Sequence, residues 1–355
     1  MLHLYRKGAA PTLLSTLLLT AVTRPAAGLM FEFNAGDGVT PEVQSGFEAA
    51  GRLWSDFFLD DITVTVDIGF QPLSGNRLGS AFSSLVGRDL DQVSAALTAS
   101  TTNAQDRQAA ASVVALGETI SFRTGGGDGA AFQLDDGAGP SNTRLAITLA
   151  NARALGLAGE MADAVDGQIV FNSGVAFDFD RSDGISGNAF DFVGTAAHEL
   201  GHILGFTSGN VFADDRTPEF LSDFGHLSTL DLFRYSEESL ALEGSDGIDI
   251  STDFRVSRPF FSIDGGRTVL ATFETGTANG TGFGGGHFSN GQGFGLLDPR
   301  AEGTGNILEV SELDLLAFDV IGYELIPEPA SGALLVTGTG LLLGRRRSRE
   351  AALRR

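Results

Sequence analysis

The chain has 355 residues, of which 42% are apolar and 19% charged, with 23 Lys and Arg, 45 Asp and Glu, and no Cys. This length suits one large domain with two lobes, or two modest domains. Without Cys there are neither disulfides nor thiolate ligands, so a metal ion would have to be held by His, Asp or Glu. The net charge of -22 argues against nucleic acid as a partner, because its phosphates would be repelled.

The ends of the chain differ in charge from its body. Removing the nine basic and two acidic residues of segments 1–27 and 327–355 from the totals leaves 14 basic and 43 acidic residues between them. Such an acidic body is typical of a soluble exported domain, and it is compatible with Ca²⁺ binding. We therefore expect a single folded body over residues 28–326.

Residues 1–27 have the pattern of a secretory signal peptide. Two basic residues near the start precede an apolar stretch from Ala9 to Val22, and the small residues Ala26 and Ala27 offer a cleavage point. The apolar stretch is short and contains a proline, which disfavours a membrane-spanning helix.

The first part of the body is predicted to contain alternating helices and strands. Apolar residues recur at helical spacing over 43–58 and over about 89–116, whereas residues 62–70 alternate as in a strand. Residues 168–172 are a second strand candidate, and the Gly- and Asp-rich segment 124–142 is expected to be a loop. We predict an α+β fold in which a mixed sheet forms the N-terminal lobe.

The segment His198-Glu199-Leu200-Gly201-His202 is the pattern that most directly indicates a chemistry. Residues four apart lie on one face of a helix, so both imidazoles can reach the same metal ion. Glu199 then stands beside the metal, where a carboxylate can act as the general base toward a zinc-activated water. The apolar residues before it predict a buried helix, and Gly205 is a natural place for that helix to end.

After Gly205 the chain becomes Gly-rich and irregular as far as Ser311. There Ser311 and Asp314 have the spacing of a helix N-cap with an acidic residue in the first turn, opening an apolar helix that runs to Ile321. The C-terminal lobe is therefore expected to be irregular and to end in a helix.

A catalytic zinc ion usually has three protein ligands, so the motif lacks one. Its extension, His198-Glu-x-x-His202-x-x-Gly205-x-x-Ser208, resembles the metzincin metalloproteases, in which a His or Asp stands where Ser208 does. Ser is a poor zinc ligand. The spacing of His287 is similar to that of the leishmanolysin branch, in which the third His follows a long insertion. A Met-containing turn then comes shortly after that His, and Leu297 occupies the place of the Met.

This resemblance implies a zincin-like fold and zinc ligands His198, His202 and His287, with Leu297 packed beneath the metal in place of Met. Other third ligands remain open from the residues alone. His226 is the other downstream His. A helical Glu such as Glu237 or Glu238 would serve in a gluzincin, and Asp231 lies one residue short of an aspzincin pattern.

The C-terminal segment 327–355 has a distinctive order of residues. Pro327-Glu328-Pro329 is followed by an apolar stretch and then by Arg345-Arg346-Arg347. It resembles the PEP-CTERM sorting signal of Gram-negative bacteria, on which an exosortase acts, and a plain membrane anchor is the alternative. The whole chain is similar to a group of bacterial PEP-CTERM proteins regarded as metalloproteases. The resemblance implies export to the cell envelope, the cell surface or the medium.

Together these observations predict an exported zinc endopeptidase that acts on proteins or peptides with Glu199 as general base. The alternative is a catalytically inactive surface or matrix protein that keeps a zincin fold. Tyr235 or Tyr323 could donate a hydrogen bond to the reacting carbonyl oxygen, although each is more often simply packed. The acidic segment 178–184 resembles a Ca²⁺ loop but departs from the EF-hand spacing, so a solvated turn is equally compatible.

Overall fold

The computed structural model describes residues 28–75, 77–125, 132–210, 225–255, 257–276, 283–299 and 303–327. The expected signal peptide and all of the expected sorting segment beyond Pro327 lie outside these residues. Within them, no helix is both long and apolar enough to cross a bilayer.

The elements up to the middle of the chain are β1 (Met30–Ala35), α1 (Pro41–Ser55), β2 (Thr63–Gln71), β3 (Gly79–Ser83), β4 (Leu85–Asp89), α2 (Leu90–Ala99), α3 (Ala104–Val114), β5 (Phe122–Thr124), β6 (Gln133–Asp135), α4 (Pro140–Thr143), β7 (Arg144–Thr148), α5 (Leu149–Ala154) and β8 (Gly167–Asn172). They are followed by β9 (Phe177–Asp178), β10 (Phe190–Asp191), α6 (Phe192–Leu204), β11 (Arg234–Tyr235), α9 (Glu237–Leu240), β12 (Ile248–Asp249), β13 (Phe260–Phe261), β14 (Ala271–Thr272) and α10 (Glu312–Val320).

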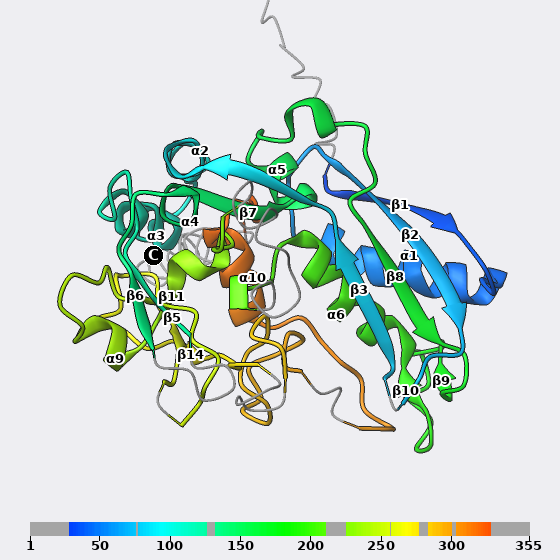
Figure 1. Ribbon diagram of the computed structural model, residues 1–355. Coiled ribbons are helices and arrows are strands. Elements are labelled where there is room, and N and C mark those ends of the chain that lie inside the picture. Colours follow the sequence, from blue (N-terminus) through cyan, green and yellow to red (C-terminus); the bar gives the residue numbers. More distant parts are fainter. Residues whose placement is uncertain are drawn as a thin grey trace, which may run out of the picture.

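A four-stranded mixed sheet organises the first lobe. Its order is β1-β2-β8-β3, in which β1, β2 and β8 run parallel and β3 runs antiparallel to β8 at the edge. In β2 the buried residues alternate with more accessible ones, as expected for a strand with one covered face. Figure 1 shows this sheet with α1 lying across it and with α6 beside β3 and β8. The predicted α+β class and mixed sheet are confirmed.

Helices α1 and α6 pack against each other beneath the sheet. Trp54 of α1 is fully buried and its Nε1–H donates to the carbonyl oxygen of Ala197 in α6 at 2.8 Å. At the other end, Phe192 lies among aromatic rings from several elements, with ring centroids 4.8 Å from Phe171 and 5.3 Å from Phe47. Gly46 makes this approach possible, because a Cβ there would lie 2.5 Å from the Phe192 ring.

Two predictions for the first half of the chain need correction. The single helix expected over 89–116 is two helices, α2 and α3, separated at residues 100–103. The Asn103 side chain accepts the N–H groups of Gln105 and Asp106 and so caps α3, which therefore begins as a separate helix. The expected loop 124–142 contains the short strand β6 and the four-residue helix α4.

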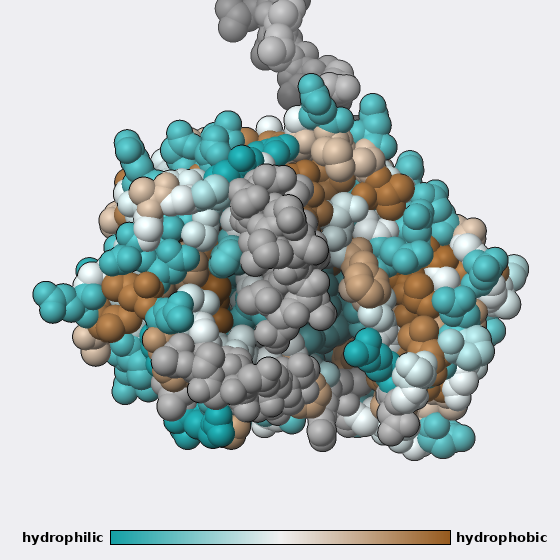
Figure 2. Space-filling model, viewed as in Figure 1, coloured by the Kyte–Doolittle hydropathy of each residue, from teal (hydrophilic) through white to brown (hydrophobic). Residues whose placement is uncertain are grey.

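The second lobe is built from short elements. Its six-stranded sheet has the order β14-β13-β11-β12-β5-β6, and four of these strands are only two residues long. Helix α10 begins after Ser311, whose hydroxyl accepts the Asp314 N–H at 3.1 Å, as the sequence pattern predicted. Figure 1 shows α10 (orange) near the middle of the molecule. On the face seen in Figure 2, hydrophilic residues are interspersed with small hydrophobic areas.

The ring cluster around Phe192 should dominate the stability of the first lobe. Replacing Phe192 with Ala removes a fully buried ring, and we expect the free energy of unfolding to fall by about 3–5 kcal/mol. Phe82 is a matched control, because its side chain is 68% exposed and its replacement with Ala should cost about 0.5 kcal/mol or less. Urea denaturation of both variants measures the difference, and equal losses would contradict this account.

Candidate metal centre

The helix that carries the motif is fixed at both ends. The Asp191 carboxylate accepts the Gly194 N–H at 3.0 Å, and the Asp191 carbonyl accepts the Thr195 hydroxyl at 2.7 Å. At the other end Gly205 has φ +125°, a conformation that residues with a Cβ rarely adopt. The predicted stop at Gly205 is therefore found, and the two motif histidines lie on the last turns of α6.

His287 folds back to the two motif histidines. Its Nε2 lies 3.2 Å from the Nε2 of His198 and 3.1 Å from that of His202, and the last two are 3.2 Å apart. The His198 and His287 rings are nearly parallel, with 23° between their planes, and the His202 ring stands at 85° to His287. Among the described residues, these three form the group of metal-binding side chains that could hold an ion.

The hydrogen bonds of the three Nδ1 atoms determine whether each Nε2 atom carries a proton or a lone pair. The Nδ1 of His198 lies 2.7 Å from the Leu296 carbonyl oxygen, and that of His202 lies 2.8 Å from the Phe206 oxygen. The Nδ1 of His287 is 2.8 Å from the carbonyl oxygen of Gly284. A carbonyl oxygen only accepts, so each Nδ1 carries the proton, and in a neutral ring Nε2 is left with a lone pair.

The neutral state of these rings is favoured by their surroundings. Burial, followed by the proximity of His202, lowers the pKa of His198 to about 3. Burial also lowers the pKa of His202, and burial together with the other two histidines lowers that of His287 well below its usual value. Three neutral imidazoles therefore point lone pairs at one another.

This arrangement fits a metal ion. Three lone pairs about 3 Å apart repel one another unless a proton or a cation lies between them, and the Nδ1 contacts place the protons elsewhere. With zinc–nitrogen bonds of about 2.0–2.1 Å and tetrahedral angles, ligand nitrogens are about 3.3–3.4 Å apart. The observed separations of 3.1–3.2 Å are close to this value. Three His ligands also leave the fourth position open, as in catalytic zinc sites.

Glu199 lies on the same helix and is held by the edge of the sheet. It lies near the backbone of Ala81 in β3 and near the Arg77 guanidinium, and both favour its charged form. Burial raises the pKa of Glu199 to about 7, and the Ala81 N–H and Arg77 oppose this rise. Strand β3 is further joined to α6 because the Ser83 hydroxyl donates to the His202 carbonyl oxygen at 3.0 Å.

The turn at Leu296 and Leu297 lies directly beneath α6. Leu297 is fully buried, and a Cβ added to Gly201 would meet its methyl groups at 3.1 and 3.2 Å. The carboxylate of Asp314 accepts the N–H groups of both leucines, at 2.8 and 3.1 Å. Leu297 thus packs on the helix that carries two of the histidines.

The structure does not bring the rival third ligands to this cluster. His226 has its ring centroid 6.4 Å from that of Phe122, at an edge-to-face angle, and it is not part of the three-His group. Glu237 and Glu238 are exposed on α9. Asp231 is buried and accepts the Ser208 hydroxyl at 2.6 Å, so both of these side chains are used in joining the segment after α6 to the second lobe.

The remaining candidate residues have structural contacts. Tyr235 and Tyr323 are 1% and 2% exposed, and their hydroxyls donate to the carbonyl oxygens of Leu232 and Leu204. In the acidic segment, Asp178 accepts the Ser186 N–H and hydroxyl at 2.9 and 2.6 Å. This contact is that of a closed turn, and the Ca²⁺ expectation gains no support from it.

Sequence reasoning missed the residues that hold the ligands. The carbonyl partners of the three rings carry no side-chain signal, so a sequence pattern could not reveal them. Asp314 was visible as part of a helix cap, but its bonds to the Leu296–Leu297 turn depend on the tertiary fold.

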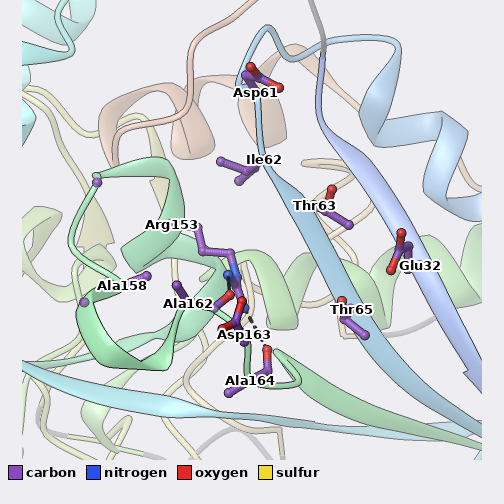
Figure 3. A pocket seen from close by; sticks show the side chains of 12 residues that line it. Glu32, Asp61, Ile62, Thr63, Thr65, Arg153, Ala158, Ala162, Asp163 and Ala164 are labelled. Atoms are coloured by element: carbon purple, nitrogen blue, oxygen red, sulfur yellow. Dashed lines mark hydrogen bonds between the residues drawn. The ribbon is translucent and has the colours of Figure 1, made fainter.

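A surface hollow of about 580 Å³ lies elsewhere, along β2, and Figure 3 shows the side chains that line it. Arg153 is the single cation among them. Its Nε donates to Asp166 at 2.8 Å, and its other nitrogens donate to the carbonyl oxygens of Ala162 and Ala164. Because the guanidinium is occupied in closing this loop, we assign no chemistry to the hollow.

No protein-family model, curated protein or solved structure matches this chain. The interpretation of the site therefore depends on its own geometry.

Metal binding should stabilise the fold through these three rings. At free zinc about 100 times the dissociation constant, we expect the free energy of unfolding to rise by about 2.7 kcal/mol, and a chelator should reverse the gain. The gain should disappear in His287→Ala and persist in His226→Ala, which serves as the matched control. Denaturant titrations with and without zinc make the comparison. A zinc-dependent gain that survives in His287→Ala would remove that residue from the ligand set.

Proposed function

We propose that this protein is a zinc-dependent endopeptidase of zincin-like fold, with His198, His202 and His287 as ligands and Glu199 as general base. The observation that carries the proposal is the meeting of the three Nε2 atoms at separations of 3.1–3.2 Å. Glu199 is the neighbour of His198 on α6. The mixed sheet, the helix beneath it and the buried turn under that helix support the zincin-like part of the proposal.

A zinc ion held by the three rings would supply Lewis acidity, which polarises a peptide carbonyl and makes a water molecule more acidic. In this proposal Glu199 would accept the proton of the attacking water and deliver it to the leaving amine. Glu199 follows His198 on α6, and the Ala81 N–H of β3 favours the charged form of its carboxyl group. The His202 backbone is held to the same strand by Ser83.

The position of β3 favours an extended peptide as substrate. It is the last strand of the sheet and pairs with β8 on one side, so among the described residues its other edge has no strand partner, and β3 also contacts α6. An extended chain can add to such an edge through main-chain hydrogen bonds. The same strand contacts Glu199 and His202, so a peptide bound along it would pass beside the metal-binding side chains.

Removing the proposed base should separate catalysis from metal binding. Glu199→Gln keeps the side-chain shape but cannot accept the proton, and we expect peptide cleavage to fall by about 10²–10⁴-fold while zinc remains bound. Cleavage of a fluorogenic peptide or casein, with zinc content measured on the same sample, tests this expectation. Glu237→Gln, at an exposed position of α9, is the control and should retain full activity.

Undiminished cleavage by Glu199→Gln would refute the assigned role. A wild-type protein that binds zinc tightly and cleaves no peptide would favour the alternative, a zincin-fold surface or matrix protein without activity.

The two ends of the chain are proposed to direct export, with residues 327–355 acting as an exosortase-type sorting or membrane-anchoring signal. Deleting residues 327–355 should change where the protein accumulates without unfolding it, because the core of the described residues lies between Leu29 and Tyr323. Cell fractionation and the intact mass of exported protein provide the measurement. Full-length protein that retains residues 1–27 and stays soluble in the cytoplasm would contradict the proposal.

A further inference from the structure

His287 lies in a part of the chain with almost no regular secondary structure. Residues 283–299 contain isolated bridges, such as the one between Phe288 and Phe273, and no helix or extended strand. A metal ligand must nevertheless be held to within about 0.5 Å of its productive position. The motif histidines obtain this precision from α6, so His287 needs another source of it.

Arg234, at the start of β11, is a buried cation beside this segment. It is 1% exposed. Its Nε donates to the Asp249 carbonyl oxygen at 3.0 Å, its Nη1 to that of Gly285 at 2.9 Å, and its Nη2 to that of Glu274. Its Cζ lies 4.7 Å from the centroid of the Phe273 ring. All three guanidinium nitrogens are thus bonded to backbone oxygens from three separate segments.

Two of these three oxygens belong to the segments that hold His287. Gly285 follows Gly284, whose carbonyl oxygen accepts the Nδ1–H of His287 at 2.8 Å. The Glu274 N–H donates to the carbonyl oxygen of His287 at 3.0 Å. Arg234 therefore ties together the chain that orients the His287 ring and the chain that holds the His287 backbone.

The guanidinium keeps its charge in this position. Burial lowers the pKa of Arg234 to about 10, opposed by the nearby carboxylates of Asp231, Asp249 and Glu274, so it stays protonated at neutral pH. A buried charge is costly unless it is paired and hydrogen-bonded. A planar fork that reaches three carbonyls is a property of Arg that the ammonium group of Lys lacks.

We propose that Arg234 is a positioning residue of the metal centre. By fixing the Gly285 and Glu274 carbonyls, it holds His287 so that its Nε2 meets those of His198 and His202. This inference rests on the proposed function, since it takes the three histidines as metal ligands.

The test compares Arg234→Lys with Arg123→Lys in the otherwise unchanged chain. Arg123 is a matched control because it is 7% exposed and pairs with the Asp249 carboxylate at 2.9 Å, from β5 on the other side of β12. Zinc affinity, measured by competition with a chromogenic chelator, should fall about 10- to 100-fold in Arg234→Lys and stay near the wild-type value in Arg123→Lys. Amide hydrogen exchange of the metal-free proteins should rise over residues 283–299 in Arg234→Lys, with α6 unchanged.

Wild-type zinc affinity and wild-type hydrogen exchange in a folded Arg234→Lys protein would overturn the proposal. Equal losses of zinc affinity in the two Arg variants would also overturn it. If the wild type binds no zinc, the proposed function fails, and the exchange of the metal-free proteins still decides whether Arg234 positions the segment. If Arg234→Lys does not fold, Phe273→Leu removes the ring beneath the guanidinium, and unchanged zinc affinity in that variant would overturn the proposal.

Discussion

Three backbone carbonyls determine the chemistry of the centre, because they decide which nitrogen of each imidazole carries the proton. The oxygens of Leu296, Phe206 and Gly284 each accept an Nδ1–H, and the three Nε2 lone pairs are left facing a common point. Their mutual repulsion opposes this packing, and a bound cation would relieve it. Under the proposed function, metal binding would therefore be coupled to the folding of the segments that carry Leu296 and Gly284.

The turn at Leu296 and Leu297 connects the two lobes at this point. The Leu296 carbonyl orients His198, and the Leu297 carbonyl accepts the N–H of Phe288, the residue after His287. The amide groups of the same turn are held by the buried carboxylate of Asp314, at the start of α10. Helix α10 thus holds, through this turn, both the ring of His198 and the backbone next to His287. It does so from near the middle of the molecule (Figure 1).

Features that depend on nearby residues could be predicted from the sequence, and features that depend on distant ones could not. The motif helix, its stop at Gly205 and the cap of α10 follow from local spacing. The split between α2 and α3 was missed because the apolar spacing continues across it, while the Asn103 cap takes precedence. His287 and His226 were both open from the residues alone. His287 lies beside the motif histidines because of contacts with distant residues, among them Glu274 and, through Gly285, Arg234, and no local pattern encodes these contacts.

Ser208 and Leu297, the two residues that differ from the expected pattern, both have structural contacts of their own. Ser208 stands where a short motif would place its third ligand, but its hydroxyl donates to Asp231 and fastens the chain after α6 to the second lobe. The branched side chain of Leu297 packs against Gly201, a role that needs an apolar side chain and no metal-binding atom. His198 and His202 are thus held by a single helix, whereas His287 comes some eighty residues later in the chain and is held by tertiary contacts. If the three histidines bind a metal ion as proposed, its affinity would therefore depend on the buried polar contacts that bring His287 to the motif as well as on the motif itself.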